Sequence, residues 1–167
     1  MDVSGNFFPA GDLATRLKRI ADILLDEMDT VLRDLGIGFE SRWRPIYQLL
    51  TEKGPLTIAE IADSLQQSHP SILHITRPMG EAGLIEIHRD RLEGNRRVMK
   101  LTYKAESIRE QLEEIWERMD EAQASAFRGG QTDIQPFLER LENHLINGNF
   151  ARRILESVQL QAEASSA

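Results

Sequence analysis

The chain has 167 residues, of which 41% are hydrophobic and 28% charged, a composition that fits a folded globular protein and excludes wholesale disorder. It contains no cysteine, which excludes disulfides, thiolate zinc sites and cysteine redox switches, and favours a cytoplasmic location. Residues 1–10 lack a basic region followed by an apolar stretch, and charges interrupt every later apolar run, so export and membrane insertion are disfavoured.

The net charge of −7 at first argues against a nucleic-acid partner, because contacts to phosphate use lysine and arginine. The charge is unevenly distributed, however. Residues 68–104 contain seven Lys or Arg and four Asp or Glu, a local charge of +3, which leaves −10 on the remainder. This basic segment is compatible with a nucleic-acid partner although the chain as a whole is acidic.

Two helices are predicted in the first third of the chain. Residues 12–35 carry apolar side chains at steps of three and four, the period of one helix face, and Gly36 supplies a stop. That face consists of Leu13, Leu17, Ile20, Leu24, Met28, Val31 and Leu35. A second helix is predicted over residues 42–52, with Ser41 as its N-cap and Pro45 in its first turn, ending at Gly54.

Two shorter helices follow. Thr57 and Glu60 have the spacing of a capping box, and the helix that they begin should bury Ile58, Ile61, Ala62 and Leu65. Ser68 is expected to cap the next helix, which has Pro70 in its first turn. The inner face of that helix is predicted to hold Ile72, Ile75 and Met79. Gly83 should close it, and Pro78 with Gly80 predicts a kink or an early end near Arg77.

The next segment is predicted to be a β-hairpin. Residues 84–89 and 97–103 are rich in β-forming residues, and the polar residues 90–96 form the tip between them. One long helix is predicted over residues 105–126, and a last helix capped by Asp133 should carry Phe137, Leu138, Leu141 and Leu145. Residues 161–167 have little to bury and are expected to fray.

A helix, a tight turn, a second helix and a hairpin within about fifty residues are typical of a winged helix-turn-helix domain. We therefore predict a mainly α fold with a small β-hairpin wing, in which residues 41–103 form the DNA-binding domain and residues 12–35 and 105–147 form helical dimerisation regions. The outward side chains of the recognition helix, placed to reach groove edges, are His69, Ser71, His74 and Arg77. At the wing, Arg91, Arg96 and Arg97 suit the adjacent DNA backbone or minor groove.

Four motifs together resemble the MarR family of regulators, over roughly residues 12–145. They are LTIAEIA at 56–62, SHPSI at 68–72, GLI at 83–85 and NRRVMKLT at 95–102. The resemblance implies a triangular homodimer with intertwined terminal helices, two winged domains that read a palindrome, and a small molecule that tunes their geometry.

The sequence departs from the family pattern at two places. Members usually have an acidic residue just before the wing arginines, which braces them; here Asn95 precedes Arg96, and Glu93 is the candidate substitute. The recognition helix carries a single arginine, Arg77, which predicts modest or shape-based sequence specificity.

The resemblance also places Trp43, Tyr47 and Trp116 best for lining an effector cavity between the dimer helices and the winged domain, although the same residues equally fit a plain core. No metal site is predicted, since His69 and His74 are five residues apart without a cysteine or paired carboxylate beside them. Carboxylate pairs such as Asp26 and Glu27 read as solvated helix faces.

We therefore expect a transcription regulator rather than an enzyme, with no cofactor. The expected partners are double-stranded DNA with an inverted-repeat operator, a second copy of the chain in a homodimer, and a small-molecule effector whose binding releases a repressor. The alternative is a winged-helix module that works through protein partners with weak or no specific DNA binding, which the acidic balance and the weak recognition helix favour. An enzyme would need a catalytic cluster or cofactor motif, and we find neither in the sequence.

Overall fold

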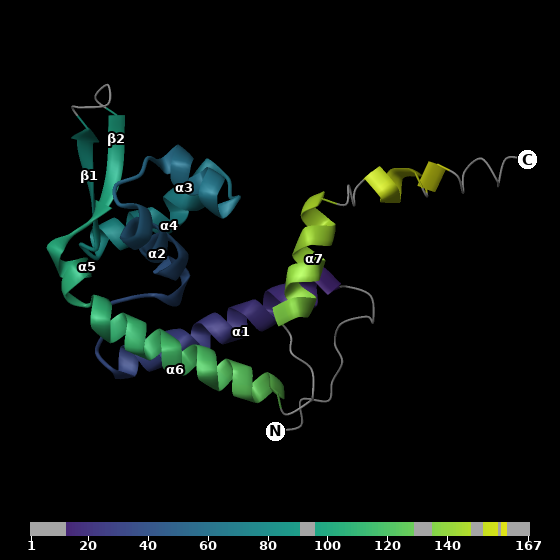
Figure 1. Cartoon of the computed structure of the whole chain (residues 1–167), viewed down its shortest axis with the longest axis horizontal. Coiled ribbons are helices and arrows are strands. Elements are labelled where there is room, and N and C mark those ends of the chain that lie inside the picture. The colour runs from purple at the N-terminus through teal and green to yellow at the C-terminus, as the bar shows by residue number, and fades with distance from the viewer. Residues whose placement is uncertain (1–12, 91–95, 129–134, 148–151, 157, 160–167) are drawn as a thin grey trace, which may run out of the picture. The chain divides into compact units, whose positions relative to one another are not determined.

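The structure is a computed structural model that describes residues 13–90, 96–128, 135–147, 152–156 and 158–159 (Figure 1). It divides into two compact units, residues 1–113 and 114–167. The elements of the first unit are α1 (Leu13–Asp34), a 3-10 helix η1 (Ser41–Trp43), α2 (Arg44–Lys53), α3 (Ile58–Leu65), α4 (His69–Glu81), β1 (Ile85–Asp90), β2 (Arg96–Leu101) and α5 (Tyr103–Ser107). Helix α6 (Arg109–Arg128) starts in the first unit, and α7 (Gln135–Asn147) lies in the second.

The first unit has the predicted winged helix-turn-helix architecture. Helix α3 packs against α4, α4 packs against β1, and α2 contacts β2. The hairpin projects from these helices, with α5 at its base (Figure 1). Fully buried side chains come from each layer, namely Ile46, Tyr47, Ile61, Ile72, Met79 and Leu84. The predicted mainly α fold with a β-hairpin wing is confirmed.

The starts of α3 and α4 are capped as their sequences predict. The Thr57 hydroxyl accepts the Glu60 N–H at 3.2 Å, and a Glu60 carboxylate oxygen accepts the Thr57 N–H at 2.7 Å. Ser68 caps α4 through its hydroxyl, which accepts the Ser71 N–H at 3.3 Å. Each cap satisfies backbone donors that have no partner inside the helix.

Helix α4 does not end near Arg77, so the early end expected there is wrong. It continues through Pro78 to Glu81, and Thr76 and Met79 are buried on its inner face. Proline removes one backbone donor, but packing of the last turn against the core compensates for the loss. The helix closes at Gly83, whose φ of +71° lets the Leu84 N–H reach the Met79 carbonyl at 3.0 Å.

The sequence predicts that Ser41 is the N-cap of α2, and this prediction is wrong. The segment begins with η1, which continues into α2, and Glu40 stands at its start without a side-chain cap. Ser41 is itself buried, and its N–H donates to the Asp29 carboxylate of α1 at 2.6 Å. A contact with a residue distant in sequence therefore takes the place of the local cap.

The single helix predicted over residues 105–126 is also wrong, because α5 and α6 are separate helices that meet at Ile108. In a continuous helix, the Ala105 carbonyl would accept the N–H of Arg109. Here that carbonyl accepts the Tyr47 hydroxyl at 2.8 Å, together with the Ile108 N–H at 3.4 Å. The buried tyrosine thus binds the helix backbone at the point where α5 ends.

The hairpin pairs β1 with β2 in antiparallel register, with Ile85 opposite Leu101 and Ile87 opposite Met99. Leu56, in the turn before α3, forms a further bridge with Met99 through hydrogen bonds of 3.0 and 2.7 Å. This bridge joins the base of the wing to the turn between α2 and α3.

Helix α1 has the predicted extent, and its apolar face is largely exposed in the single chain. Leu13 is 55% exposed, Ile20 50%, Val31 43%, and Leu35, just past the end of the helix, 54%. Contiguous exposed apolar side chains of this kind usually mark a surface that another molecule covers.

Candidate nucleic-acid interface

The outward face of α4 carries the side chains predicted to read DNA. His69, Ser71, His74 and Arg77 are all exposed, whereas Ile72, Thr76 and Met79 of the same helix are buried. Ser71 makes a hydrogen bond of 2.9 Å with the Ser68 hydroxyl at the helix start. The helix therefore buries one face in the winged domain and presents polar and basic side chains on the other.

Arg96, predicted to contact DNA, is held by an acidic side chain of α3. Its Nη2 donates to Glu60 Oε1 at 2.6 Å. The Arg96 side chain is 40% exposed and the Glu60 side chain 42%. The pKa of Glu60 falls from its usual 4.5 to about 2, first because its carboxylate accepts the Thr57 N–H and then because it accepts Arg96 and the Thr57 hydroxyl. Glu60 thus braces Arg96, a role for which the sequence had suggested Glu93.

Arg97 faces a second arginine across the hairpin. In the strand register Arg97 lies directly opposite Arg89, and both side chains are exposed. Sequence reasoning did not select Arg89. The predicted strand limits of 84–89 and 97–103 nevertheless make residues 89 and 97 the closing pair of the hairpin, so counting pairs inward from the tip would have found it. Arg91, Glu93 and Asn95 lie outside the described residues.

On the other face of the hairpin, a carboxylate pairs with basic side chains of the same hairpin. Glu86 Oε1 lies 2.9 Å from His88 Nε2 and 3.1 Å from Lys100 Nζ and accepts a hydrogen bond from each. These contacts, His88 first, lower the pKa of the Glu86 carboxyl. Lys100 and His88 are therefore engaged within the protein.

The predicted effector-binding aromatics lie in different surroundings. Phe39 meets both Trp43 and Tyr47 edge-on, with ring centroids 5.6 and 5.5 Å apart. Tyr47 is buried, and burial is the main cause that raises the pKa of its hydroxyl. Its bond to the Ala105 carbonyl gives it a structural role in the core of the winged domain.

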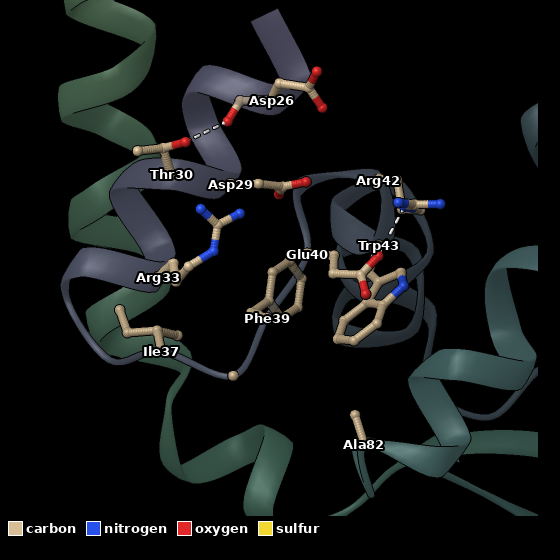
Figure 2. Close-up of a pocket in the computed structure, with 11 residues that line it drawn as sticks. Asp26, Asp29, Thr30, Arg33, Ile37, Phe39, Glu40, Arg42, Trp43 and Ala82 are labelled. Carbon is tan, nitrogen blue, oxygen red and sulfur yellow. Dashed lines mark hydrogen bonds and ion pairs between the residues drawn. The ribbon is translucent and has the colours of Figure 1, made fainter. Parts of the chain in front are cut away.

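Trp43 lines a cavity of about 590 Å³ between the C-terminal half of α1, the loop that follows it and the end of α4 (Figure 2). Phe39, Arg33 and the carboxylates of Asp29 and Glu40 contribute to the same walls, and Arg42 is paired with Glu40 at 2.8 Å. Trp43 is 4% exposed, and its indole N–H has no hydrogen-bond partner among the described residues. Tyr47 is not among the lining residues.

Trp116 is buried as well, at 3% exposed, but it belongs to the second unit of the chain. Within the described residues, we find no group of three metal-ligating side chains placed to hold an ion. Nor does any helix there have the length and apolar character needed to cross a membrane.

Solved structures of MarR family regulators share this fold. A DNA complex of MepR from S. aureus is 18% identical, with a TM-score of 0.57, and the match covers 87% of this chain and 96% of that one. The MarR family regulator SPO1453 from Silicibacter pomeroyi DSS-3 is 18% identical, with a TM-score of 0.61 and coverage of 83% and 98%.

A third similar structure is the transcriptional regulator PcaV from Streptomyces coelicolor in complex with its natural ligand. It is 17% identical, with a TM-score of 0.56, and the match covers 95% of this chain and 99% of that one. No family model and no curated protein sequence matches the chain. At these identities the comparisons establish the fold, which is that of MarR-type winged-helix regulators.

Proposed function

We propose that this protein is a cytoplasmic MarR family regulator that binds duplex DNA as a homodimer and represses transcription. The observation that carries the proposal is the outward face of α4, which exposes polar and basic side chains while its opposite face is buried. A winged-helix domain lays such a helix in the major groove. The fold shared with a MepR–DNA complex supports this assignment.

In the proposed complex, His69, Ser71, His74 and Arg77 face the major groove. Arg77 suits a bidentate contact to guanine, whereas the hydroxyl and imidazole groups suit base edges or phosphate. Arg97 and Arg91 of the wing are assigned to the DNA backbone or minor groove, and Arg96 contacts DNA only from the position in which Glu60 holds it.

A second copy of the chain is the proposed occupant of the exposed apolar face of α1. Leu13, Ile20, Val31 and Leu35 are between 43% and 55% exposed in the single chain. Residues 12–35 and 105–147 would form the dimerisation region. A two-fold dimer presents two recognition helices, so the operator should be an inverted repeat with half-site centres about 10 bp apart.

The cavity beside Trp43 is the proposed site of a small-molecule effector that releases the DNA. It has about 590 Å³ of space, within the usual range for sites of small ligands, and combines two aromatic rings with arginine and carboxylate groups. The structure of PcaV in complex with its natural ligand supports a ligand site in a protein of this fold. Trp43 is assigned to this cavity, and Tyr47 supports its wall through the edge-on contact with Phe39.

A gel-shift experiment tests the proposal, with duplex DNA from upstream of the protein's own gene and a scrambled duplex of the same length as control. We expect a discrete shifted complex that the scrambled duplex competes away poorly. Equal, weak binding of both duplexes at physiological salt would contradict specific regulation and favour the protein-interaction module.

A further inference from the structure

We propose that Arg89 and Arg97 together form a clamp that grips one backbone phosphate of bound DNA. The inference rests on the proposed DNA-binding function and adds to it a residue, Arg89, and a geometry. In the register of the hairpin the two arginines lie directly opposite each other, and so on the same face. Directly opposed residues have Cβ atoms about 5 Å apart, a spacing at which two guanidinium groups can converge on one anion.

The arginine pair is an exception within its own hairpin. Glu86 is opposite Lys100, a pair of opposite charge, and Ile87 is opposite Met99, an apolar pair. The remaining pairs are Ile85 with Leu101, His88 with Val98 and Asp90 with Arg96, so that Arg89 with Arg97 is the one pair of like charges in the described register. Like charges placed directly opposite each other destabilise a hairpin. A local rule broken at one place in an otherwise consistent element is the usual mark of a functional site.

Both guanidinium groups are also free to bind a ligand. Arg89 and Arg97 are exposed, and neither makes a hydrogen bond or ion pair with any residue in the part of the chain that the structure describes. Their neighbours differ in this respect, since Arg96 is held by Glu60 and Lys100 by Glu86. Among the described basic residues of the wing, Arg96, Lys100 and His88 are paired with carboxylates, whereas the opposed pair Arg89 and Arg97 is not.

A phosphodiester fits this pair in both charge and shape. Guanidinium is planar and permanently charged, and it donates two parallel hydrogen bonds to the oxygens of a phosphate. One phosphate between the two groups would relieve their repulsion. The wing of a winged-helix domain reaches the DNA backbone beside the groove that the recognition helix occupies, where phosphates recur regardless of sequence.

The test measures DNA affinity against salt concentration, together with thermal melting, for the full-length protein. The probe is a mixed-sequence DNA duplex, and the variants are R89Q/R97Q, R97E and the control K100Q. Lys100 is a suitable control because it lies on the same hairpin but is engaged by Glu86. In a dimer with two wings, R89Q/R97Q should flatten the log–log salt slope by about 1.8, or 0.9 for each phosphate released, and K100Q should leave the slope unchanged.

R97E is expected to raise the stability of the protein and to lower its affinity for DNA. A glutamate opposite Arg89 forms an attractive cross-strand pair, so the melting temperature should rise while DNA affinity falls at least tenfold at low salt. An unchanged slope in R89Q/R97Q, with a wild-type protein that binds the duplex, would overturn the clamp alone. A melting temperature that falls in both R97E and R89Q/R97Q would overturn the argument from repulsion.

A wild-type protein that binds neither this duplex nor upstream DNA would overturn the proposed function and the clamp together. If an acidic protein partner occupied the pair instead, the variants would lose that partner while the DNA salt slope stayed the same, which also counts against the clamp. A parallel loss of affinity for operator and scrambled DNA supports it, because phosphate contacts carry no sequence information.

Discussion

Glu60 and Arg96 join the start of α3 to the start of β2, although they are 36 residues apart in the chain. One carboxylate oxygen of Glu60 accepts the Thr57 N–H and hydroxyl at 2.7 and 2.8 Å, while the other accepts Arg96 at 2.6 Å. The same carboxylate therefore completes a helix cap and fixes the wing. Together with the Leu56–Met99 bridge, it attaches β2 to the helical body at two points.

Substitutions at Glu60 should separate these two roles. Glu60→Gln keeps an oxygen that can cap α3 but loses the charge that holds Arg96, so we expect a destabilisation of up to about 1 kcal/mol, typical of an exposed ion pair. Glu60→Ala removes the cap as well and should cost about 1 kcal/mol more. Chemical denaturation measures both losses. A double-mutant cycle with Arg96→Gln that gave no coupling energy would contradict the brace.

The stability of the winged domain should fall in acid through Glu60. Its pKa is about 2 in the folded protein and 4.5 in its usual state, so the unfolded chain binds the proton more tightly. The contribution is therefore complete above pH 4.5 and is lost as the pH falls from 4.5 towards 2. Because the side chain is 42% exposed, solvent screening keeps the effect small. Melting curves of Glu60→Gln should show a weaker pH dependence in this window than those of the wild type.

Tyr47 is expected to stabilise the protein through its hydroxyl. Tyr47→Phe removes the hydrogen bond to the Ala105 carbonyl and should cost about 0.5–1.5 kcal/mol. Tyr103→Phe is the matched control, because Tyr103 is 89% exposed. Thermal melts of the two variants provide the comparison. Equal melting temperatures for both would show that the hydroxyl bond does not contribute to the fold.

Much of this architecture can be predicted from the sequence because its determinants are local. Thr57 and Glu60 lie three residues apart and cap α3 as predicted, and the inner face of α4 follows from the helical period of Ile72 and Met79. The hairpin likewise follows from two β-rich runs around a polar tip.

The errors arise where a distant residue overrides a local signal. Asp29 of α1 accepts the Ser41 N–H in place of a local cap, and Tyr47 binds the Ala105 carbonyl where the helix predicted through Ile108 is interrupted. The brace of Arg96 by Glu60 likewise has no local signal, because the two residues are 36 apart in the chain. None of these three contacts has a periodic or short-range signature.

In the proposed DNA complex, the Arg77 side chain on the outward face of α4 contacts the edge of a base. Arg77→Ala should then cost about 1–3 kcal/mol of binding free energy at one operator position and relax the sequence preference there. Binding titrations against operators mutated one base pair at a time measure this effect. If the variant instead binds every sequence more weakly by the same factor, Arg77 contacts phosphate.

The proposed homodimer depends on the apolar face of α1. Ile20→Glu places a charge within that face and should convert the dimer to a monomer or drive aggregation, because the charge would have to be buried without a partner. Lys18→Gln is the control, since Lys18 pairs with Asp22 away from the apolar stripe. Light scattering distinguishes the outcomes. A wild-type monomer at micromolar concentration would contradict the dimer.

The Leu56–Met99 bridge also determines which side of the sheet is open to other chains. Leu56 takes backbone groups on the outer side of β2, which leaves β1 as the open edge of the described hairpin. An open edge invites strand pairing between molecules unless charges oppose it. Glu86, His88 and Arg89 place such charges along β1. We therefore expect Arg89 to disfavour edge-to-edge pairing, so that its neutral variants self-associate more readily at high protein concentration.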